Sequence, residues 1–302
     1  MKTVKKPIVR HTKYNSKKAV LNMVKSIFKR VFETVKKKPF EIFGFSIVKM
    51  LIEAVICAVP IVPVAILVFI GSFIQYYISY RVAGMVFAAV AIIPILIVVC
   101  LAILAICATM VLEVGIYKMY LGYVSEGKGK ISDLFFGFKS MKLFLRIIGG
   151  YWWKMLFIFL WGIIPVAGVF IAIYKVYSYR FSSIILIMKP EVSVKESLEV
   201  SKLMTNGKKG SMFLCDLIIA GIVFGVSLIG EVISIIPIIG WILGVPIGIA
   251  LWVIAIASEI VMYLTTACFY YVLDNGIFEE EILFEEIKDN YFMNCENYEN
   301  EE

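Results

Sequence analysis

The sequence has little of what metal chemistry and polar catalysis usually need. Its 302 residues include one histidine, His11, and only 18% of them are charged. The sequence therefore has too few histidines for a typical zinc site or a histidine-based catalytic triad. No P-loop, HExxH helix or dinucleotide-binding fingerprint is present. These absences predict a protein that is not an enzyme and that holds no metal or cofactor.

Cysteine chemistry is also poorly represented. The 6 cysteines form no CxxC pair, and all except Cys295 lie in or beside apolar runs. Buried cysteine usually behaves as a small hydrophobic residue. We therefore expect neither a disulfide framework nor a metal-binding cysteine cluster.

Apolar residues, in contrast, are abundant. They make up 61% of the chain, and the mean hydropathy is +0.90. A soluble domain has roughly 45–50% apolar residues, and this chain has more than a polar surface could cover. The composition predicts an integral membrane protein of the all-α class.

Long apolar runs divide the chain into six predicted transmembrane helices. A span needs about 20 apolar residues. On that rule the spans lie at about 47–75, 83–111, 143–162, 167–188, 212–236 and 243–270. The third and fourth are separated only by the turn 163–166, and a single helix over both would be about 69 Å long. Because that is twice a bilayer, we expect helical hairpins, with a basic arm at 1–46, the membrane domain at 47–272 and an acidic tail at 273–302.

Lysine and arginine predict how the chain is threaded. Residues 1–50 hold fourteen of the 30 Lys and Arg, and the connections 112–142 and 189–211 add five lysines each. With six spans all these basic segments fall on one side, which the positive-inside rule makes cytoplasmic. We expect a multi-pass protein of the cell membrane with both termini in the cytoplasm.

The two ends of the chain carry opposite charge. Between Ser16 and Lys38, apolar residues recur at helical spacing with lysines mostly off that stripe, which favours an amphipathic helix that lies on the membrane and attracts anionic lipid. The alternative is a helix packed against the protein's own cytoplasmic loops. From Asp274 onward, eleven acidic residues face a single basic one, Lys288, so the tail is a solvated segment that could bind a partner or the basic arm.

A second amphipathic helix is predicted in the 189–211 connection. Ser193 and Glu196 have the spacing of a capping box. Val194 and Leu198, four residues apart, begin an apolar face that is interrupted at Ser201. We expect a helix over 193–204 at the inner membrane surface.

Ionisable residues inside the predicted spans are the strongest indication of a functional site. They are costly in a bilayer and usually pair or line a polar path. Our candidate polar cluster comprises Lys175, Arg180, Asp216, Glu259 and Glu113. Within it, Asp216 is the favoured partner of Arg180, whose guanidinium cannot lose its charge. The alternative is a set of structural pairs and snorkelling side chains.

Glycines at four-residue spacing predict close helix packing. They are Gly240, Gly244 and Gly248 in the last span and Gly221 and Gly225 in the fifth. Small residues at this spacing allow two helix backbones to approach. Packing within one chain is favoured over a homo-oligomer.

Four short motifs between about 124 and 217 carry a family resemblance. They are Gly127-Lys128 with Ile131-Ser132-Asp133-Leu134-Phe135 and Gly137-Phe138; Leu160-Trp161 with Ile163-Ile164-Pro165; Tyr177-Ser178-Tyr179-Arg180 with Ile184-Ile185-Leu186 and Pro190; and Ser201-Lys202, Met204, Gly207, Lys209, Phe213 and Asp216-Leu217. In order and spacing this third of the chain resembles the domain-of-unknown-function 975 family of bacterial integral membrane proteins. After Leu217 the chain departs from the family pattern, and its two tails are longer. The resemblance implies a bacterial multi-span protein and supplies no activity.

Two functions remain open on these observations. The first is a non-enzymatic membrane protein that organises lipid or protein partners through its charged cytoplasmic arms. The second is a transporter or export accessory that uses the polar residues of spans four to six. An intramembrane enzyme lacks a nucleophile and base pair, and the basic arm has no nucleic-acid-binding fold around it, so we expect no nucleic acid partner.

Overall fold

The computed structural model describes residues 17–77, 80–165, 167–235 and 237–276, and all regular structure in these ranges is helical. In chain order the elements are α1 Lys17–Lys37, α2 Pro39–Tyr77, α3 Tyr80–Glu126, α4 Ile131–Leu134, the short 3₁₀ helix η1 Phe136–Phe138, α5 Met141–Gly162, α6 Ala167–Ser178, α7 Ser182–Met188, α8 Val194–Met204, α9 Lys209–Ile235 and α10 Pro237–Asp274.

Six helical stretches are long and apolar enough to cross a membrane. They are Pro39–Phe73, Pro94–Glu126, Met141–Gly162, Ala167–Met188, Lys209–Ile233 and Gly244–Asp274. The all-α, multi-pass fold class predicted from the sequence is thereby confirmed. The helices begin and end differently from the predicted spans, because α2 starts eight residues earlier and α3 continues to Glu126.

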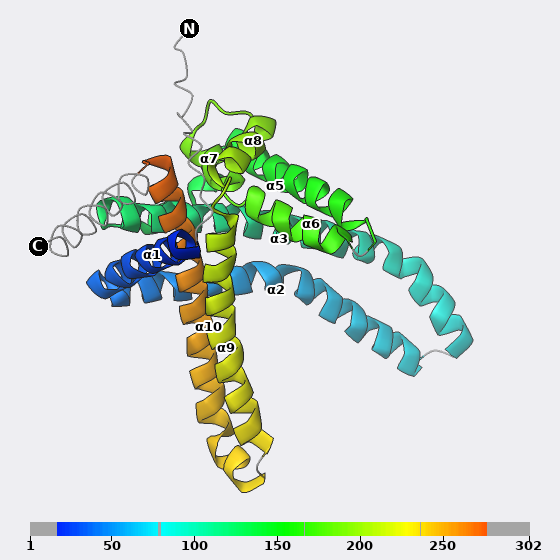
Figure 1. Cartoon of the computed structure of the whole chain (residues 1–302). Helices are drawn as coiled ribbons and strands as arrows, with labels where there is room; N and C mark the ends of the chain where they lie inside the picture. Colours follow the sequence, from blue (N-terminus) through cyan, green and yellow to red (C-terminus); the bar gives the residue numbers. More distant parts are fainter. Residues whose placement is uncertain (1–16, 78–79, 166, 236, 277–302) are drawn as a thin grey trace, which may run out of the picture.

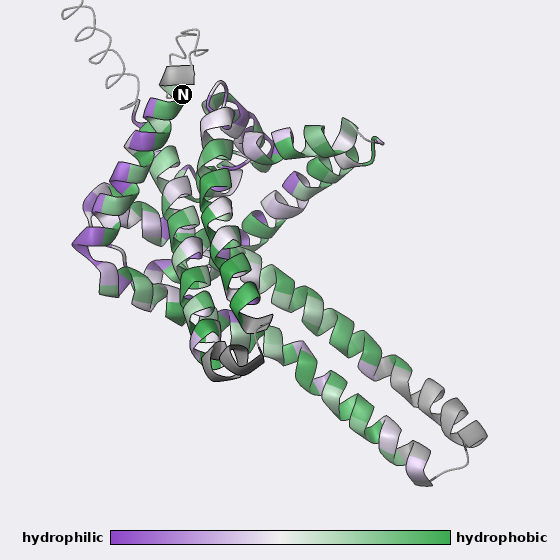
Figure 2. Cartoon of the chain, turned by 60° about the horizontal axis from the view of Figure 1, so that its bottom comes forward, coloured by the Kyte–Doolittle hydropathy of each residue, from purple (hydrophilic) through white to green (hydrophobic). Residues whose placement is uncertain are grey.

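The long helices form three hairpins, α2 with α3, α5 with α6, and α9 with α10 (Figure 1). Their tips point in different directions, whereas their other ends meet. We call that meeting region, which also contains α1, α4, α7 and α8, the junction. Figure 2 shows the coloured part of the α2–α3 hairpin as mostly hydrophobic, whereas hydrophilic residues are frequent on α1.

Among the residues whose burial is described, buried side chains lie at the junction end of the long helices. In α2 the last buried residue is Lys49, and in α3 the first described one is Val111. In α10 the first described buried residue is Ile256. Toward the tips, side chains such as Phe69 and Ile222 are exposed. The described outer parts of the hairpins therefore present apolar side chains to lipid and share little core with one another.

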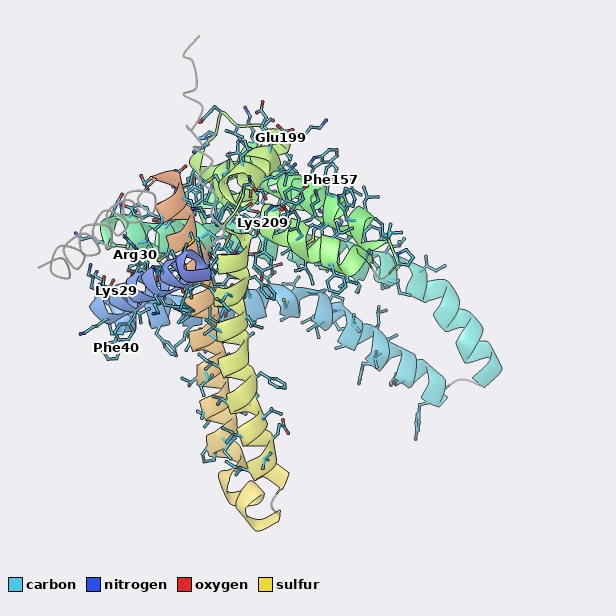
Figure 3. The ribbon with its side chains drawn as sticks, viewed as in Figure 1. Lys29, Arg30, Phe40, Phe157, Glu199 and Lys209 are labelled. Atoms are coloured by element: carbon cyan, nitrogen blue, oxygen red, sulfur yellow. The ribbon has the colours of Figure 1, made fainter. Side chains whose placement is uncertain are left out.

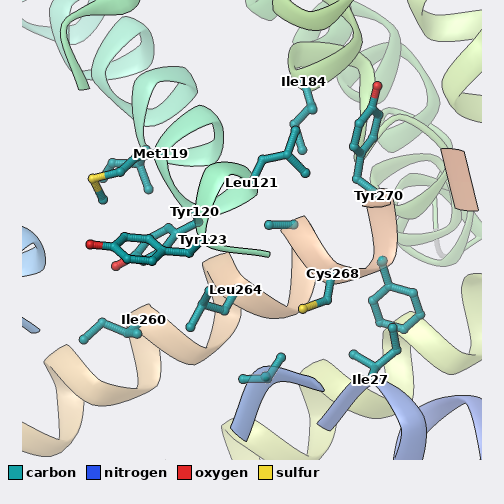
Figure 4. Packing of buried hydrophobic residues seen from close by; sticks show 14 of the residues in the cluster. Ile27, Met119, Tyr120, Leu121, Tyr123, Ile184, Ile260, Leu264, Cys268 and Tyr270 are labelled. Carbon is teal, nitrogen blue, oxygen red and sulfur yellow. The ribbon is translucent and has the colours of Figure 1, made fainter. Parts of the chain in front are cut away.

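The core of the junction joins segments from both ends of the chain (Figure 4). Leu264 and Cys268 of α10 lie between Tyr120 of α3 and Ile27 of α1, and all four side chains are almost completely buried. Within the described residues, α1 of the predicted basic arm therefore contributes to the core of the junction.

The apolar stripe of α1 packs on the protein. Met23, Val24, Ile27 and Val31 are buried, and α1 contacts α9 and α10. The sequence analysis favoured a helix on the membrane and gave packing against the cytoplasmic loops as the alternative, whereas the partners of α1 are the long helices α9 and α10. The packing leaves Phe32 and several lysines exposed on the opposite face.

The fourth predicted span is not one helix. α6 has 12 residues, or about 18 Å, which is shorter than the roughly 30 Å hydrocarbon core. The chain breaks at Tyr179–Phe181, and the 7 residues of α7 are buried in the junction except for Met188. The predicted span 167–188 thus coincides with the candidate span Ala167–Met188, but its helix is interrupted, and polar groups at the break are satisfied by other helices, as described next.

Candidate functional site: charged clusters at the helix junction

Arg180 lies at the break between α6 and α7 and binds a carboxylate on another helix. Its Nη1 and Nη2 donate to the two carboxylate oxygens of Asp216 at 2.5 and 3.0 Å. Its Nε and Nη2 also donate to Oγ1 of Thr266, at 3.1 and 2.7 Å. The bidentate pair with Asp216, which the sequence analysis favoured, therefore ties the α6–α7 break to α9, and Thr266 adds α10.

Tyr177 completes this cluster from α6. Its hydroxyl donates to Asp216 Oδ2 at 2.9 Å. The Arg180 and Asp216 side chains are 13% and 18% exposed. Because each charge has an opposite charge and additional hydrogen bonds, the cluster can remain in a poorly hydrated place without an unsatisfied group.

The helix break is stabilised by α8. Ser201 Oγ donates to the Ser178 carbonyl at 2.9 Å and accepts from the Phe181 backbone N–H at 3.1 Å. Thr205 Oγ1 donates to the same carbonyl at 3.3 Å. Ser201, which interrupts the apolar face of the predicted helix, is buried because it satisfies backbone groups that the broken helix leaves without helical partners.

Glu259 belongs to a second cluster, built around Lys49 of α2. The Lys49 ammonium forms ion pairs with Glu259 of α10 and, at 3.0 Å, with Glu53 of its own helix. It also lies 5.3 Å from the centre of the Tyr263 ring. The Lys49 side chain is only 7% exposed, so this cluster links α2 to α10 inside the junction.

Lys49 was not among the predicted site residues, because it was counted only with the Lys and Arg of residues 1–50 although it lies in the predicted span 47–75. Its spacing of four residues from Glu53 was a usable signal for an ion pair on one helix face. Thr266 carried no such signal, since a threonine in an apolar run is ordinary. Both residues depend on tertiary contacts that no local pattern encodes.

Glu113 of α3 lies between the two clusters. It interacts electrostatically with Tyr117, and Tyr117 also interacts electrostatically with Arg180 and Asp216. It interacts in the same way with Tyr263 and Glu53 on the side of the second cluster. The tyrosines Tyr117 and Tyr263 pack edge to face, with ring centres 5.1 Å apart. The candidate residues thus form two clusters bridged by aromatic side chains and Glu113, instead of one site.

Lys175 is separate from both clusters. Its ammonium lies 5.1 Å from the centre of the Trp161 ring and 5.8 Å from that of Tyr179. No carboxylate among the described residues forms an ion pair with it. Ion pairs therefore do not join Lys175 to Asp216 or Glu259 within the described residues, and its place in the candidate polar cluster stays a prediction.

The glycines predicted to pack helices closely do not do so within the described part of the chain. A Cβ atom added to Gly221, Gly225, Gly244 or Gly248 meets no other atom within 4 Å, and the surroundings of Gly240 lie outside the described residues. Close approaches occur elsewhere. A Cβ on Gly115 would lie 2.0 Å from the Leu134 carbonyl oxygen, where α3 meets α4.

The chemistry available at the junction is that of ion pairing. No group of three or more His, Cys, Asp or Glu in the residues that the structure describes could hold a metal ion. The two clusters connect α2, α6, α9 and α10 through paired charges. Their geometry fixes helices relative to one another.

Comparison with protein-family models, curated proteins and solved structures finds no match for this chain. What the fold and the hydropathy establish is the class, a multi-pass helical membrane protein. The resemblance to the domain-of-unknown-function 975 family rests on the motifs given above.

Proposed function

We propose that this protein is a non-enzymatic scaffold of a bacterial cytoplasmic membrane that gathers anionic lipid around its junction. In this proposal the junction and both termini face the cytoplasm, as the positive-inside rule suggests. The membership in the domain-of-unknown-function 975 family that the motifs suggest fits a bacterial membrane but adds no activity.

The observation that carries this proposal is the pairing of charges at the junction. Arg180 with Asp216, and Lys49 with Glu53 and Glu259, each connect different helices. Charges used in this way hold the inner ends of the hairpins together, while the exposed apolar outer parts remain in contact with lipid. Such an arrangement favours a scaffold over a pathway that must open.

Anionic lipid is the favoured partner because of the exposed cations at the junction. On α1, Lys25, Lys29, Lys36 and Lys37 are exposed, next to the exposed apolar side chain of Phe32. Lysines near a membrane surface each contribute about 1 kcal/mol of attraction to anionic lipid.

The second candidate function is transport, and Glu113 is the observation that favours it. Glu113 is half-buried and belongs to neither ion-paired cluster, although Lys154 interacts with it electrostatically. A carboxylate at this depth can serve as a proton relay in transporters.

Lipid selectivity tests the scaffold proposal. The full chain is reconstituted in phosphatidylcholine vesicles that contain trace spin-labelled phosphatidylglycerol or trace spin-labelled phosphatidylcholine. We expect the motionally restricted fraction to be larger for phosphatidylglycerol, and the difference to shrink as salt rises because the attraction is screened. Equal fractions for the two lipids at low salt would contradict the proposal.

A further inference from the structure

Lys209 packs on Tyr174 at the junction, and lysines from two other helices lie within electrostatic range of the same tyrosine. The Lys209 ammonium, at the start of α9, lies 3.8 Å from the centre of the Tyr174 ring. Lys175, in the last turn of α6, and Lys202, in the last turn of α8, also interact electrostatically with Tyr174. Figure 3 places Lys209 at the junction end of α9. The fold thus brings together cations that are far apart in the sequence.

No carboxylate neutralises this group within the described residues. None of the three lysines forms an ion pair there, and the nearby Asp216 is occupied by Arg180. Glu199, three residues before Lys202 on α8, is exposed and makes no ion pair with it. Like charges gathered without counter-charge create a positive potential that attracts an anion.

The apolar surface beside the lysines fits the chains of a lipid. On α9, Phe213 and Leu217 follow Lys209 at four-residue spacing and are 46% and 53% exposed. On α6, Phe170 lies one turn from Tyr174 on the tip side and is 73% exposed. Two neighbouring helices therefore carry exposed apolar stripes that start at the lysines and run toward the hairpin tips.

We propose that Lys175, Lys202 and Lys209, with the Tyr174 hydroxyl, bind the phosphodiester group of an anionic phospholipid whose acyl chains lie along α6 and α9. The ammonium groups and the hydroxyl supply the donors, and the exposed apolar stripes supply the contact with the chains. This proposal rests on the proposed function and names the site at which it operates.

The test compares two triple variants with equal loss of charge. Lys175→Gln/Lys202→Gln/Lys209→Gln removes the site, whereas Lys128→Gln/Lys130→Gln/Lys142→Gln removes three exposed lysines that precede α4 and begin α5. Full chains are released from phosphatidylcholine nanodiscs containing a minor fraction of phosphatidylglycerol, and the retained phosphatidylglycerol is measured by native mass spectrometry. We expect the site variant to lose the retained lipid, at roughly fivefold in affinity per lysine, and the control variant to keep it. An equal loss in both variants, or none in the site variant, would overturn the proposal.

Two further measurements complete the test: a competition with inorganic phosphate, and a single variant for the case that the triple variant does not fold. Inorganic phosphate replaces chloride at constant ionic strength, and retained lipid should not change; displacement of the lipid by phosphate would make this a site for free phosphate and overturn the proposal. If the site variant does not fold, Lys202→Gln alone, on an exposed residue of α8, should still lower retention about fivefold. A wild-type chain without lipid selectivity would refute the proposed function as well, whereas selectivity that survives loss of the site refutes only this site.

Discussion

Arg180 carries a permanent charge into a place that is largely shielded from water, since its side chain is 13% exposed. It can lie there because Asp216 neutralises it and Thr266 occupies further donors. Arg180 lies in the break between α6 and α7, and from this position its side chain reaches Asp216 of α9. The residue therefore acts on the structure through a pair, and its effect should be measured as a pair.

Arg180→Ala and Asp216→Ala should each lower stability by about 3–5 kcal/mol, because each leaves one charge unpaired and poorly hydrated. The double variant should lose less than the sum of the two. Heating of the detergent-solubilised chain, followed by size-exclusion chromatography, measures the folded fraction. Tyr177→Phe, which removes only one hydrogen bond to Asp216, serves as the control and should cost about 0.5–1.5 kcal/mol. Strictly additive losses of the two alanine variants would show that the pair does not couple.

Sequence reasoning reached some of these residues and not others. Arg180 and Asp216 stand out because ionisable residues are rare in apolar runs. Their pairing could be predicted from their similar depth. The partner of Glu259 could not, since Lys49 lies at the start of another predicted span and no local pattern links the two residues. Thr266 and Ser201 are ordinary residues in a sequence and gain their roles only when distant helices meet.

Among the elements, α1 shows how one helix can satisfy two environments. Its buried stripe completes the junction core, and its lysines face outward. Helical spacing revealed the amphipathic pattern but could not say whether the apolar face met lipid or protein. Both surfaces are apolar, so the pattern is the same.

Ile27 and Phe32 of α1 provide a matched pair of truncations. Ile27 is fully buried and Phe32 is 68% exposed. Ile27→Ala should destabilise the folded chain by about 2–5 kcal/mol, because it leaves a cavity in the core. Phe32→Ala should change stability little. Thermal unfolding in detergent measures the two losses of stability. A larger loss from Phe32→Ala would mean that α1 packs on the protein through the face that carries Phe32.

The cap of α8 should control the first turn of that helix. Ser193 Oγ accepts from the Glu196 backbone N–H, and the Glu196 carboxylate accepts from the Ser193 backbone N–H at 2.9 Å. Ser193→Ala should weaken the helix by about 1 kcal/mol, whereas Ser193→Asp should retain the cap. Amide hydrogen exchange in the first turn of α8 measures the difference. Equal exchange in all three proteins would show that the cap contributes nothing.

The same cap gives α8 a dependence on pH. The hydrogen bonds from Ser193 hold the pKa of Glu196 below its usual value. Its contribution is therefore complete above the unfolded-state pKa and is lost as pH falls through the folded-state pKa. Exchange in the first turn, corrected for the intrinsic rate, should rise over that acidic range and should not change between neutral and mildly alkaline pH.

The α5–α6 hairpin includes a close backbone approach at Gly168. A Cβ on Gly168 would lie 2.7 Å from the Trp161 carbonyl oxygen and 2.8 Å from that of Gly162, whereas one on Gly162 meets nothing within 4 Å. Gly168→Ala should cost about 1–3 kcal/mol through overpacking, and Gly162→Ala should be neutral or slightly stabilising. Thermal unfolding of the two variants tests this, and equal values would contradict the close contact.

For the whole molecule, hydropathy and charge predict the spans and their threading, but they do not predict how the helices pack. Six apolar runs and the hairpin at 163–166 follow from length alone, and the basic connections locate the junction end. The break in the fourth span, the extra length of α3 and the absence of close contacts at the glycine stripe do not follow. Each of these depends on which helices contact one another. The sequence does not reveal those contacts, because residues that face lipid and residues that face protein in a membrane are equally apolar.

The two candidate functions, scaffold and transporter, differ most in what they require of the junction. A scaffold keeps the junction closed, whereas a transporter must open it. The native cysteines report on this directly. Cys215, beside Asp216, and Cys268 are buried in the junction, and Cys295 lies in the acidic tail. Sealed vesicles of each orientation, treated with a membrane-impermeant maleimide and mapped by mass spectrometry, show which thiols water reaches. The scaffold account predicts that Cys295 reacts only from the cytoplasmic side and that Cys215 and Cys268 react only after denaturation; reaction of either buried thiol from the outer side of a folded chain would contradict it.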